Sequence, residues 1–417
     1  MNITLISLSF PPEINSSSHL FHGLGCEFVK RGHHVTAVTG FPSYNMDRAS
    51  LPARYRKGLR LVETMDGIRV VRARTLQMPR NVPVLRGIDQ FLTAGAFALA
   101  GIFAGDPRPD VVLVYSPPLP LGLSGWAVKT LRGGRLVLNV QDLFPQNAID
   151  LGVLRSGILI SLYRRIESFL YRRADAVAVH SRGNETHVVA HGGSSAHTRV
   201  VLNPVDTKTV VPGPRNGAFR RREGIGEREQ VVSYAGIMGY AQDMDTVVGA
   251  ASLLQDREDL LFYIVGDGVE KPRIMQRAQG MKNVRFLPMQ ERDRYLELLQ
   301  ASDVCLATLR DSMKTPVVPA KILSVMAAGR PLVAAFPPEG DAPAMIREAG
   351  CGVCVEAGNP SALAQAVAEV LADPERAAEY GRRGRVWAET RCSMEGCASA
   401  YERMFTDITR RSNVGVS

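Results

Sequence analysis

The stretch from Pro319 to Val333, PAKILSVMAAGRPLV, has the residue order of an anion site. We predict a short amphipathic helix from Ala320 to about Ala328, ended by Gly329 and followed by a buried strand. Such a helix directs free amides and the positive end of its dipole at a ligand, and Lys321 adds a full charge in the first turn. The segment therefore predicts a phosphate site, although helix, glycine and strand also form ordinary α/β connections.

Glycine or proline also interrupts the chain after three predicted strands of the second half. The residues are Gly236 and Gly239 with Gln242, then Gly266, Asp267 and Gly268, then Leu287, Pro288 and Met289. Because glycine lets the backbone approach a ligand closely, these breaks together predict a nucleotide pocket at one sheet edge. Asp243 and Asp245 form an Asp-x-Asp pair, but their place at a helix start favours capping over metal binding.

Polar residues follow strand ends in the first half as well. Glu13 and the run Asn15, Ser16, Ser17 and Ser18 precede a predicted helix, where small hydroxyl residues cap the helix or leave its amides open to a ligand. Asp142 follows another strand, either as a functional acid or as a cap. No GxGxxG follows the first strand, because Gly23 and Gly25 lie inside the predicted helix, and this disfavours a dinucleotide-binding enzyme.

The elements that must position these residues alternate between short apolar strands and helices, which predicts α/β domains with parallel sheets. Strands are expected at 3–9, 34–39, 68–72, 111–115, 136–140, 176–180, 200–202, 231–235, 261–265, 284–287, 304–307, 332–335 and 352–355. The segment 203–217 is rich in proline, glycine and polar residues, so it is expected to be a linker. We predict domains at 1–205 and 206–394, with a ligand cleft at their strand ends, and a final helix within 395–417 that returns to the first domain.

The net charge of +9 is unevenly distributed along the 417 residues. Residues 1–205 carry 23 Lys and Arg against 13 Asp and Glu, whereas residues 206–417 carry 27 against 28. The first half is therefore expected to meet an anionic partner or to present a solvated basic face. A membrane surface is preferred to nucleic acid, because the basic pairs are not interleaved with aromatic residues. The apolar run 91–104 is too short to span a bilayer and predicts a core helix or one lying in the membrane interface.

The six cysteines, at 26, 305, 351, 354, 392 and 397, lack the spacing of a disulfide framework, which predicts a reducing cytoplasm. Cys351 and Cys354 form a CxxC in an apolar run without a second ligand pair. Buried core cysteines are favoured there over a metal or redox site. No secretory signal is recognised before the first strand.

Taken in order, the motifs resemble those of family 4 glycosyltransferases, in particular the bacterial fucosamine-transferase-like branch that builds cell-surface polysaccharides. The matching segments are FPPE at 10–13, RGH at 31–33, TGFP at 39–42 with Tyr44, SPP at 116–118, DLFP at 142–145, YRRAD at 171–175, AG at 235–236, AQ at 241–242, VGDG at 265–268 and the segment from Pro319 to Pro331. The resemblance covers nearly the whole chain and implies the GT-B fold of two Rossmann-like domains.

The resemblance implies a retaining transfer of a sugar from a nucleotide diphosphate, most often uridine-linked, with no metal or other cofactor. The acceptor would be a polyprenyl-diphosphate-linked saccharide at the inner face of the cytoplasmic membrane, with the protein bound peripherally. Gly236 and Gly239 would lie against the donor phosphates, and Lys321 with Ala320 would stabilise the departing diphosphate. Residues 266–268 and 287–289 would enclose base and ribose. Glu13, residues 15–18 and Asp142 would face the transferred sugar or the acceptor.

The chain departs from the family pattern in two places. Ser324 and Pro316 stand where many members carry the acids of the donor site, and Ile237 and Gln242 replace an Arg and a Lys at the phosphate loop. A serine cannot hold two ribose hydroxyls as a carboxylate does. The alternatives to an active transferase are a non-catalytic homologue that binds lipid-linked sugar or a partner enzyme, and a nucleotide-sugar epimerase.

Overall fold

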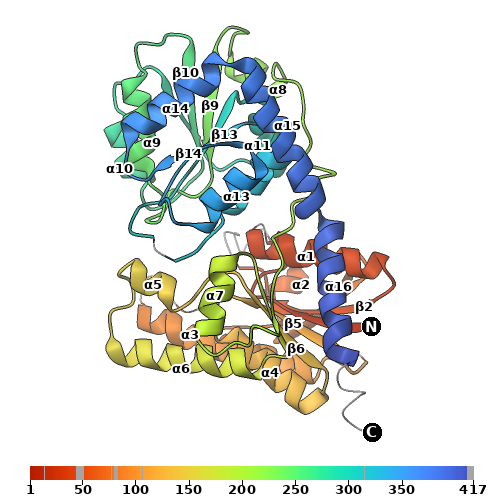
Figure 1. The fold of residues 1–417 in the computed structure, drawn as a ribbon. Coiled ribbons are helices and arrows are strands. Elements are labelled where there is room, and N and C mark those ends of the chain that lie inside the picture. Colours follow the sequence, from red (N-terminus) through yellow and green to blue (C-terminus); the bar gives the residue numbers. More distant parts are fainter. Residues whose placement is uncertain are drawn as a thin grey trace. The chain divides into compact units, whose positions relative to one another are not determined.

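The computed structural model describes residues 1–13, 15–43, 51–76, 78, 83–105, 107–313 and 315–410. The chain divides into two compact units (Figure 1). Unit 1 comprises residues 1–149, 154–203 and 394–417, and unit 2 comprises residues 150–153 and 204–393. Each unit is built around one sheet, so the predicted α/β class is confirmed.

Unit 1 contains an eight-stranded sheet that is parallel except at one edge. In spatial order its strands are β3 (Arg60–Met65), β4 (Ile68–Ala73), β2 (His34–Gly40), β1 (Asn2–Ile6), β5 (Val111–Ser116), β6 (Arg135–Val140), β7 (Ala176–Val179) and β8 (Thr198–Val200). The sequence patterns missed β3, an antiparallel edge strand in which exposed and half-buried residues alternate.

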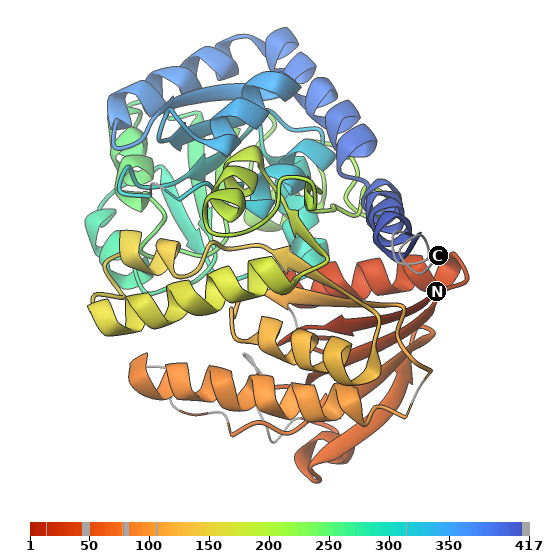
Figure 2. The ribbon, with the colours of Figure 1, turned by 60° about the horizontal axis from the view of Figure 1, so that its bottom comes forward.

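Helices cover both faces of this sheet (Figure 2). The helices of unit 1 are α1 (Ser16–Lys30), α2 (Ala53–Arg56), α3 (Pro83–Ile102), α4 (Leu121–Arg132), α5 (Gln146–Asp150), α6 (Gly157–Arg173), α7 (Arg182–Ala190) and α16 (Met394–Arg410). One apolar core joins Phe21 and Phe28 of α1 to Tyr401 and Phe405 of α16. The opposite core joins Phe97 of α3 to side chains of α4, α6 and α7.

Charged contacts fasten α16 to α1 within unit 1. Arg31 donates to the Glu402 carboxylate and to the Glu395 carbonyl, and His33 Nε2 lies 2.7 Å from Glu402 Oε1. Burial alone would raise the pKa of Glu402, but the hydrogen bonds from His33 and Arg31 outweigh it and lower that pKa. The last helix is therefore an integral part of unit 1.

Unit 2 contains a six-stranded parallel sheet. Its spatial order is β11 (Val284–Leu287), β10 (Leu260–Val265), β9 (Gln230–Ala235), β12 (Val304–Thr308), β13 (Leu332–Phe336) and β14 (Gly352–Glu356). The helices are α8 (Ala218–Glu223), α9 (Met244–Leu253), α10 (Lys271–Arg277), α11 (Arg292–Ala301), α12 (Ala320–Ala327), α13 (Asp341–Ala349), α14 (Pro360–Ala372) and α15 (Pro374–Arg391).

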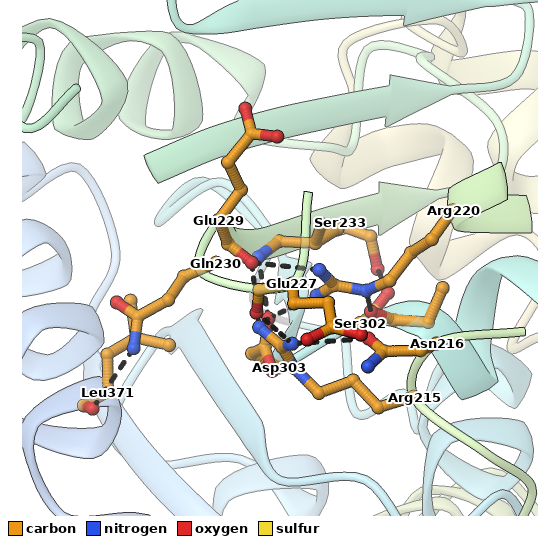
Figure 3. Close-up of polar contacts among 12 residues, drawn as sticks. Arg215, Asn216, Arg220, Glu227, Glu229, Gln230, Ser233, Ser302, Asp303 and Leu371 are labelled. Atoms are coloured by element: carbon orange, nitrogen blue, oxygen red, sulfur yellow. Dashed lines mark hydrogen bonds and ion pairs between the residues drawn. The ribbon is translucent and has the colours of Figure 1, made fainter. Parts of the chain in front are cut away.

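An ion network lies where β9 and β12 begin (Figure 3). The carboxylate of Asp303 accepts from Arg215, from Arg220 Nη2 at 2.6 Å and from the backbone N–H of Val231 at 2.7 Å. Arg220 is 2% exposed, and its remaining N–H groups donate to the carbonyls of Ala301, Gly226 and Glu229. The network joins α8 and both strands through charges whose hydrogen bonds are satisfied.

Replacing Asp303 by Ala leaves the buried Arg220 charge without its counterion. We expect the free energy of unfolding to fall by about 3–5 kcal/mol, the usual loss when one partner of a buried pair is removed. Urea denaturation followed by circular dichroism measures it. The matched control is Asp259→Ala, which removes an exposed pair with Arg257 and should cost less than about 1 kcal/mol. Equal losses in the two variants would contradict a special role for Asp303.

Candidate functional site

Two strand-end loops of unit 2 touch through their backbones at three glycines. Gly236 follows β9 with φ of 143°, and Gly266 and Gly268 follow β10 with φ of 142° and 150°. A Cβ atom on Gly266 would lie 1.9 Å from the Gly236 carbonyl oxygen, and one on Gly268 would lie 2.3 Å from that of Met238. Backbone bonds from Gly236 to Val265 and from Met238 to Asp267 fix the loops at this separation. Only glycine therefore fits at these positions.

Lys321 lies in the first turn of α12, against the first of these loops. Its Nζ is buried and has no hydrogen-bond acceptor among the described residues. It sits 3.7 Å from the ring centroid of Tyr234, whose hydroxyl donates to the Ile237 carbonyl at 2.7 Å. A Cβ on Gly236 would come within 2.9 Å of the ammonium, so the glycine leaves room for it. Burial lowers the pKa of Lys321 to about 7.

This arrangement is suited to binding an anion. Pro319 precedes α12 and supplies no side-chain cap, so the helix N-terminus is not occupied by a side chain of its own N-cap residue. A buried ammonium that faces only an aromatic ring is poorly compensated, because a ring face replaces little of its lost hydration. A phosphate placed here would supply the missing counterion and acceptors.

Several other residues predicted for the donor site adjoin these loops. Gln242 Oε1 accepts from the Gly239 N–H at 3.0 Å and braces the loop. The Leu287 carbonyl accepts from the Gly266 N–H at 3.1 Å, which adds the end of β11 to the cluster. Asp267 is exposed, and its Oδ1 accepts from the Gly268 N–H at 2.8 Å. Met289 is 55% exposed.

Ser324 lies one turn along α12 from Lys321, and its hydroxyl is hydrogen-bonded to that of Tyr295 on α11. Burial raises the pKa of Tyr295, and this hydrogen bond opposes the rise. Ser324 therefore has a partner inside unit 2 in addition to any ligand.

The Asp-x-Asp pair after the glycine loop that follows β9 caps a helix and forms ion pairs. Asp243 accepts from the Thr246 N–H as the N-cap of α9 and also from the Gly358 N–H, which confirms the capping prediction. Asp245 is paired with Arg273 and Arg277, and these hydrogen bonds lower its pKa. Neither acid belongs to a group of three possible metal ligands among the described residues.

In unit 1 the predicted acids follow strands of one sheet edge. Glu13 is 5% exposed and its Oε1 accepts from the Ser43 N–H at 2.6 Å. Asp142 is exposed after β6. Burial raises the pKa of Tyr115 at the end of β5, and the charge of Asp142 adds to that rise.

Asn15 caps α1 by accepting from the Ser18 N–H at 2.9 Å, and it also accepts from the Ser17 hydroxyl. Ser16 begins α1, and the Ser18 side chain is fully buried.

Two positioning residues escaped the sequence patterns. Tyr234 supplies the ring beneath Lys321, although its place inside an apolar strand resembles that of any core tyrosine. Arg72 is fully buried in β4 and donates to the carbonyls of Gly40 and Pro11 and to Glu63. It therefore orders the loop that carries Glu13. An arginine inside the apolar run of β4 was the available signal.

Family models match both units. Residues 19–204 match the glycosyl transferase 4-like domain, and residues 229–373 match the glycosyl transferases group 1 domain. The chain is a family 4 glycosyltransferase. The glycosyltransferase resembles the probable glycosyltransferase WbjE of Pseudomonas aeruginosa, with 29% identity over 70% of this chain and 73% of the relative. It is 24% identical to the putative colanic acid biosynthesis glycosyl transferase WcaI of Escherichia coli, over 92% of this chain and 96% of the relative.

Solved structures confirm that the glycosyltransferase has the GT-B fold. Sucrose-phosphate synthase from Thermosynechococcus elongatus superposes with a TM-score of 0.77 and 19% identity, covering 98% of this chain and 99% of that one. The Anabaena protein HepE in complex with UDP gives a TM-score of 0.70 and 16% identity, covering 98% of this chain and 100% of that one.

The contact between the two glycine loops makes a prediction about stability. Gly266→Ala places a methyl group on the Gly236 carbonyl and should lower the free energy of unfolding by about 3 kcal/mol or more, through overpacking added to backbone strain. Gly280→Ala is the matched control, because Gly280 also has positive φ (86°) but no atom within 4 Å of the added Cβ. The free energy of unfolding of Gly280→Ala should fall by only about 1–2 kcal/mol. Similar losses in both variants would show that the contact is unimportant.

Proposed function

We propose that the protein is a retaining glycosyltransferase with a uridine-diphosphate-linked sugar donor. The acceptor would be a polyprenyl-diphosphate-linked saccharide in the synthesis of a bacterial cell-surface polysaccharide. The observation that carries the proposal is the buried Lys321 ammonium, which has no acceptor within the described part of the chain and lies beside glycine loops that let a ligand approach. The polysaccharide role draws on WcaI, named for colanic acid biosynthesis, and the donor class draws on the complex of HepE with UDP.

In this proposal Lys321 and the amides at the start of α12 stabilise the negative charge that develops on the departing diphosphate. Such charge stabilisation acts in the transition state and asks for no covalent chemistry from the protein. Gly236 and Gly239 would approach the phosphates, and the loops at 266–268 and 287–289 would hold base and ribose. Because the reaction needs positioning and charge stabilisation from these groups, we propose that it requires no metal.

On unit 1 we assign Glu13, residues 15–18 and Asp142 to the sugar and acceptor side. Ser43 holds the Glu13 carboxylate in place, and Asp142 lies exposed at the same sheet edge. Ser324 stands where many family members carry the acid that binds the donor ribose, and its hydroxyl is also shared with Tyr295. Weaker donor binding is consistent with this replacement. A lost charged hydrogen bond of this kind costs roughly 1–3 kcal/mol, which lowers affinity without abolishing transfer.

The low pKa of Lys321 makes UDP binding depend on pH. A bound diphosphate favours the charged ammonium and raises the pKa of Lys321 above its free value of about 7. Binding then takes up a proton, so UDP affinity should fall as the pH rises from 7 to 9, by at most about tenfold per pH unit. Isothermal titration calorimetry of the parent protein and of Lys321→Ala measures this. Lys321→Ala should bind UDP weakly, and its UDP affinity should lack the decrease with pH that comes from the Lys321 ammonium.

Turnover tests the same residue. Lys321→Ala should reduce the rate of sugar transfer by roughly 100-fold or more, as removal of a charge-stabilising donor does in other enzymes. Lys282→Ala, a lysine change on the chain segment before β11, is the control and should retain full activity. A parent protein that does not bind UDP at millimolar concentration would support a non-catalytic homologue. Sugar interconversion without an acceptor would indicate an epimerase.

We further propose that α3 attaches unit 1 to an anionic membrane surface. Helix α3 has two faces: Phe97 is fully buried, whereas Ile88, Leu92 and Leu99 are exposed at helical spacing, and so is Phe103 directly after the helix. Phe91 of α3 stacks on Tyr163 of the neighbouring helix α6. Helix α6 also carries exposed apolar side chains, Ile158 and Leu162, and an exposed Arg165. Among the described residues, no helix is long and apolar enough to cross a membrane. An apolar stripe flanked by arginines suits the interface.

Replacing Leu99 and Phe103 together by Ser should therefore weaken binding to the membrane. In flotation with vesicles containing anionic phospholipid, the parent protein should float and the variant should remain in solution. Both side chains are more than half exposed, so the variant should stay folded. The control is Leu253→Ser, which changes an exposed leucine of α9 in unit 2. Equal flotation of parent and double variant would remove α3 from the proposal.

A further inference from the structure

Three side chains with metal-binding atoms meet in unit 1, outside the strand-end loops. His22 and Cys26 are one turn apart on α1 and project from the same face, and Asp66 lies in the turn between β3 and β4. His22 Nε2 is 2.9 Å from Asp66 Oδ2 and 3.4 Å from Cys26 Sγ. The three ligand atoms all lie within 4.8 Å of one another.

The fold holds the third ligand against the helix. Asp66 adopts φ of 50° and Gly67 φ of 80°, the backbone of a tight Asp-Gly hairpin turn. A Cβ on Gly67 would lie 2.7 Å from Cγ1 of Val29, so the turn packs directly on α1. The carboxylate is therefore brought to His22 and Cys26 by packing that does not depend on a bound ion.

We propose that His22, Cys26 and Asp66 bind one zinc ion, with water as the fourth ligand. Zinc bonds of about 2.0–2.3 Å place tetrahedral ligand atoms roughly 3.2–3.8 Å apart. The Cys26 to His22 separation of 3.4 Å lies in this range, and the His22 to Asp66 separation of 2.9 Å would open slightly when the ion replaces their hydrogen bond. Thiolate and imidazole select zinc over magnesium or calcium. Cys26 loses its thiol proton to solvent on binding, and the thiolate and the Asp66 carboxylate together balance the two charges of the ion.

The surroundings leave these ligands available. In the part of the chain that the structure describes, His22 is the one side chain with a hydrogen bond to Asp66 or Cys26. The side chains of Asp66 and His22 are 63% and 24% exposed, so an ion can enter from solvent. A second cluster, Glu167 with His187 and His191, differs because Arg164 and Tyr171 already occupy the Glu167 carboxylate. The adjacent guanidinium disfavours a cation there.

Calorimetric titration of the chelator-stripped full chain with zinc tests the site, with Co²⁺ as a spectroscopic probe. We expect one equivalent to bind, a higher melting temperature, and a thiolate-to-cobalt charge-transfer band in the near ultraviolet. His22→Ala and Cys26→Ser should lower zinc affinity by roughly 100-fold or more, since even outer-shell partners are worth 10–100-fold. Asp66→Asn is a second variant that preserves the turn, because Asn also tolerates the left-handed conformation.

The matched control is Cys354→Ser, which removes a half-buried cysteine of unit 2 that belongs to no ligand cluster among the described residues. It should leave zinc binding and the cobalt band unchanged. Zinc binding below one equivalent, a cobalt complex without the charge-transfer band, or unchanged affinity in Cys26→Ser would each overturn the proposal. Circular dichroism of each variant separates loss of the ligand from loss of the fold.

Discussion

The backbone contact between Gly266 and the Gly236 carbonyl is the constraint on which the strand-end loops of unit 2 depend. It draws the loops after β9 and β10 into contact, and the backbone bond to Leu287 adds the end of β11. The resulting surface is made of main chain, so amides and carbonyls stand where side chains would otherwise project. Lys321 then enters the space that Gly236 leaves open, and a second ammonium, that of Lys271, donates to the Gly266 carbonyl at 2.8 Å.

The positively charged side chains at the two edges of the unit 2 sheet have opposite surroundings. Where the strands begin, Arg215 and Arg220 share the Asp303 carboxylate and their other N–H groups meet carbonyls, so the charges are compensated (Figure 3). Where the strands end, the Lys321 ammonium contacts a tyrosine ring and finds no acceptor among the residues that the structure describes. The first edge gives structural rigidity. The second leaves a buried ammonium poorly compensated, which costs folding stability, and under the proposed function a bound phosphate would offset that cost.

Most of the fold could be predicted because its strands are short apolar runs separated by turn residues, and this pattern reports burial directly. The edge strand β3 was missed because its alternating side chains are only half-buried. In the candidate site, the glycines and Lys321 were recognisable from their positions after strands. Tyr234 beneath the ammonium, Tyr295 against Ser324 and the arginines against Asp245 were not, because these contacts join residues that are far apart in the chain.

The attachment of α16 to unit 1 has a consequence for synthesis of the chain. Tyr401 and Phe405 complete the apolar core on one face of a sheet whose first strand is β1, and Glu402 binds Arg31 and His33. A ribosome therefore releases nearly all of unit 1 and the whole of unit 2 before that core is covered. Domains usually fold as they emerge, N-terminal first. Here the N-terminal unit must wait, with one side of its sheet incompletely covered, for the last helix to be made.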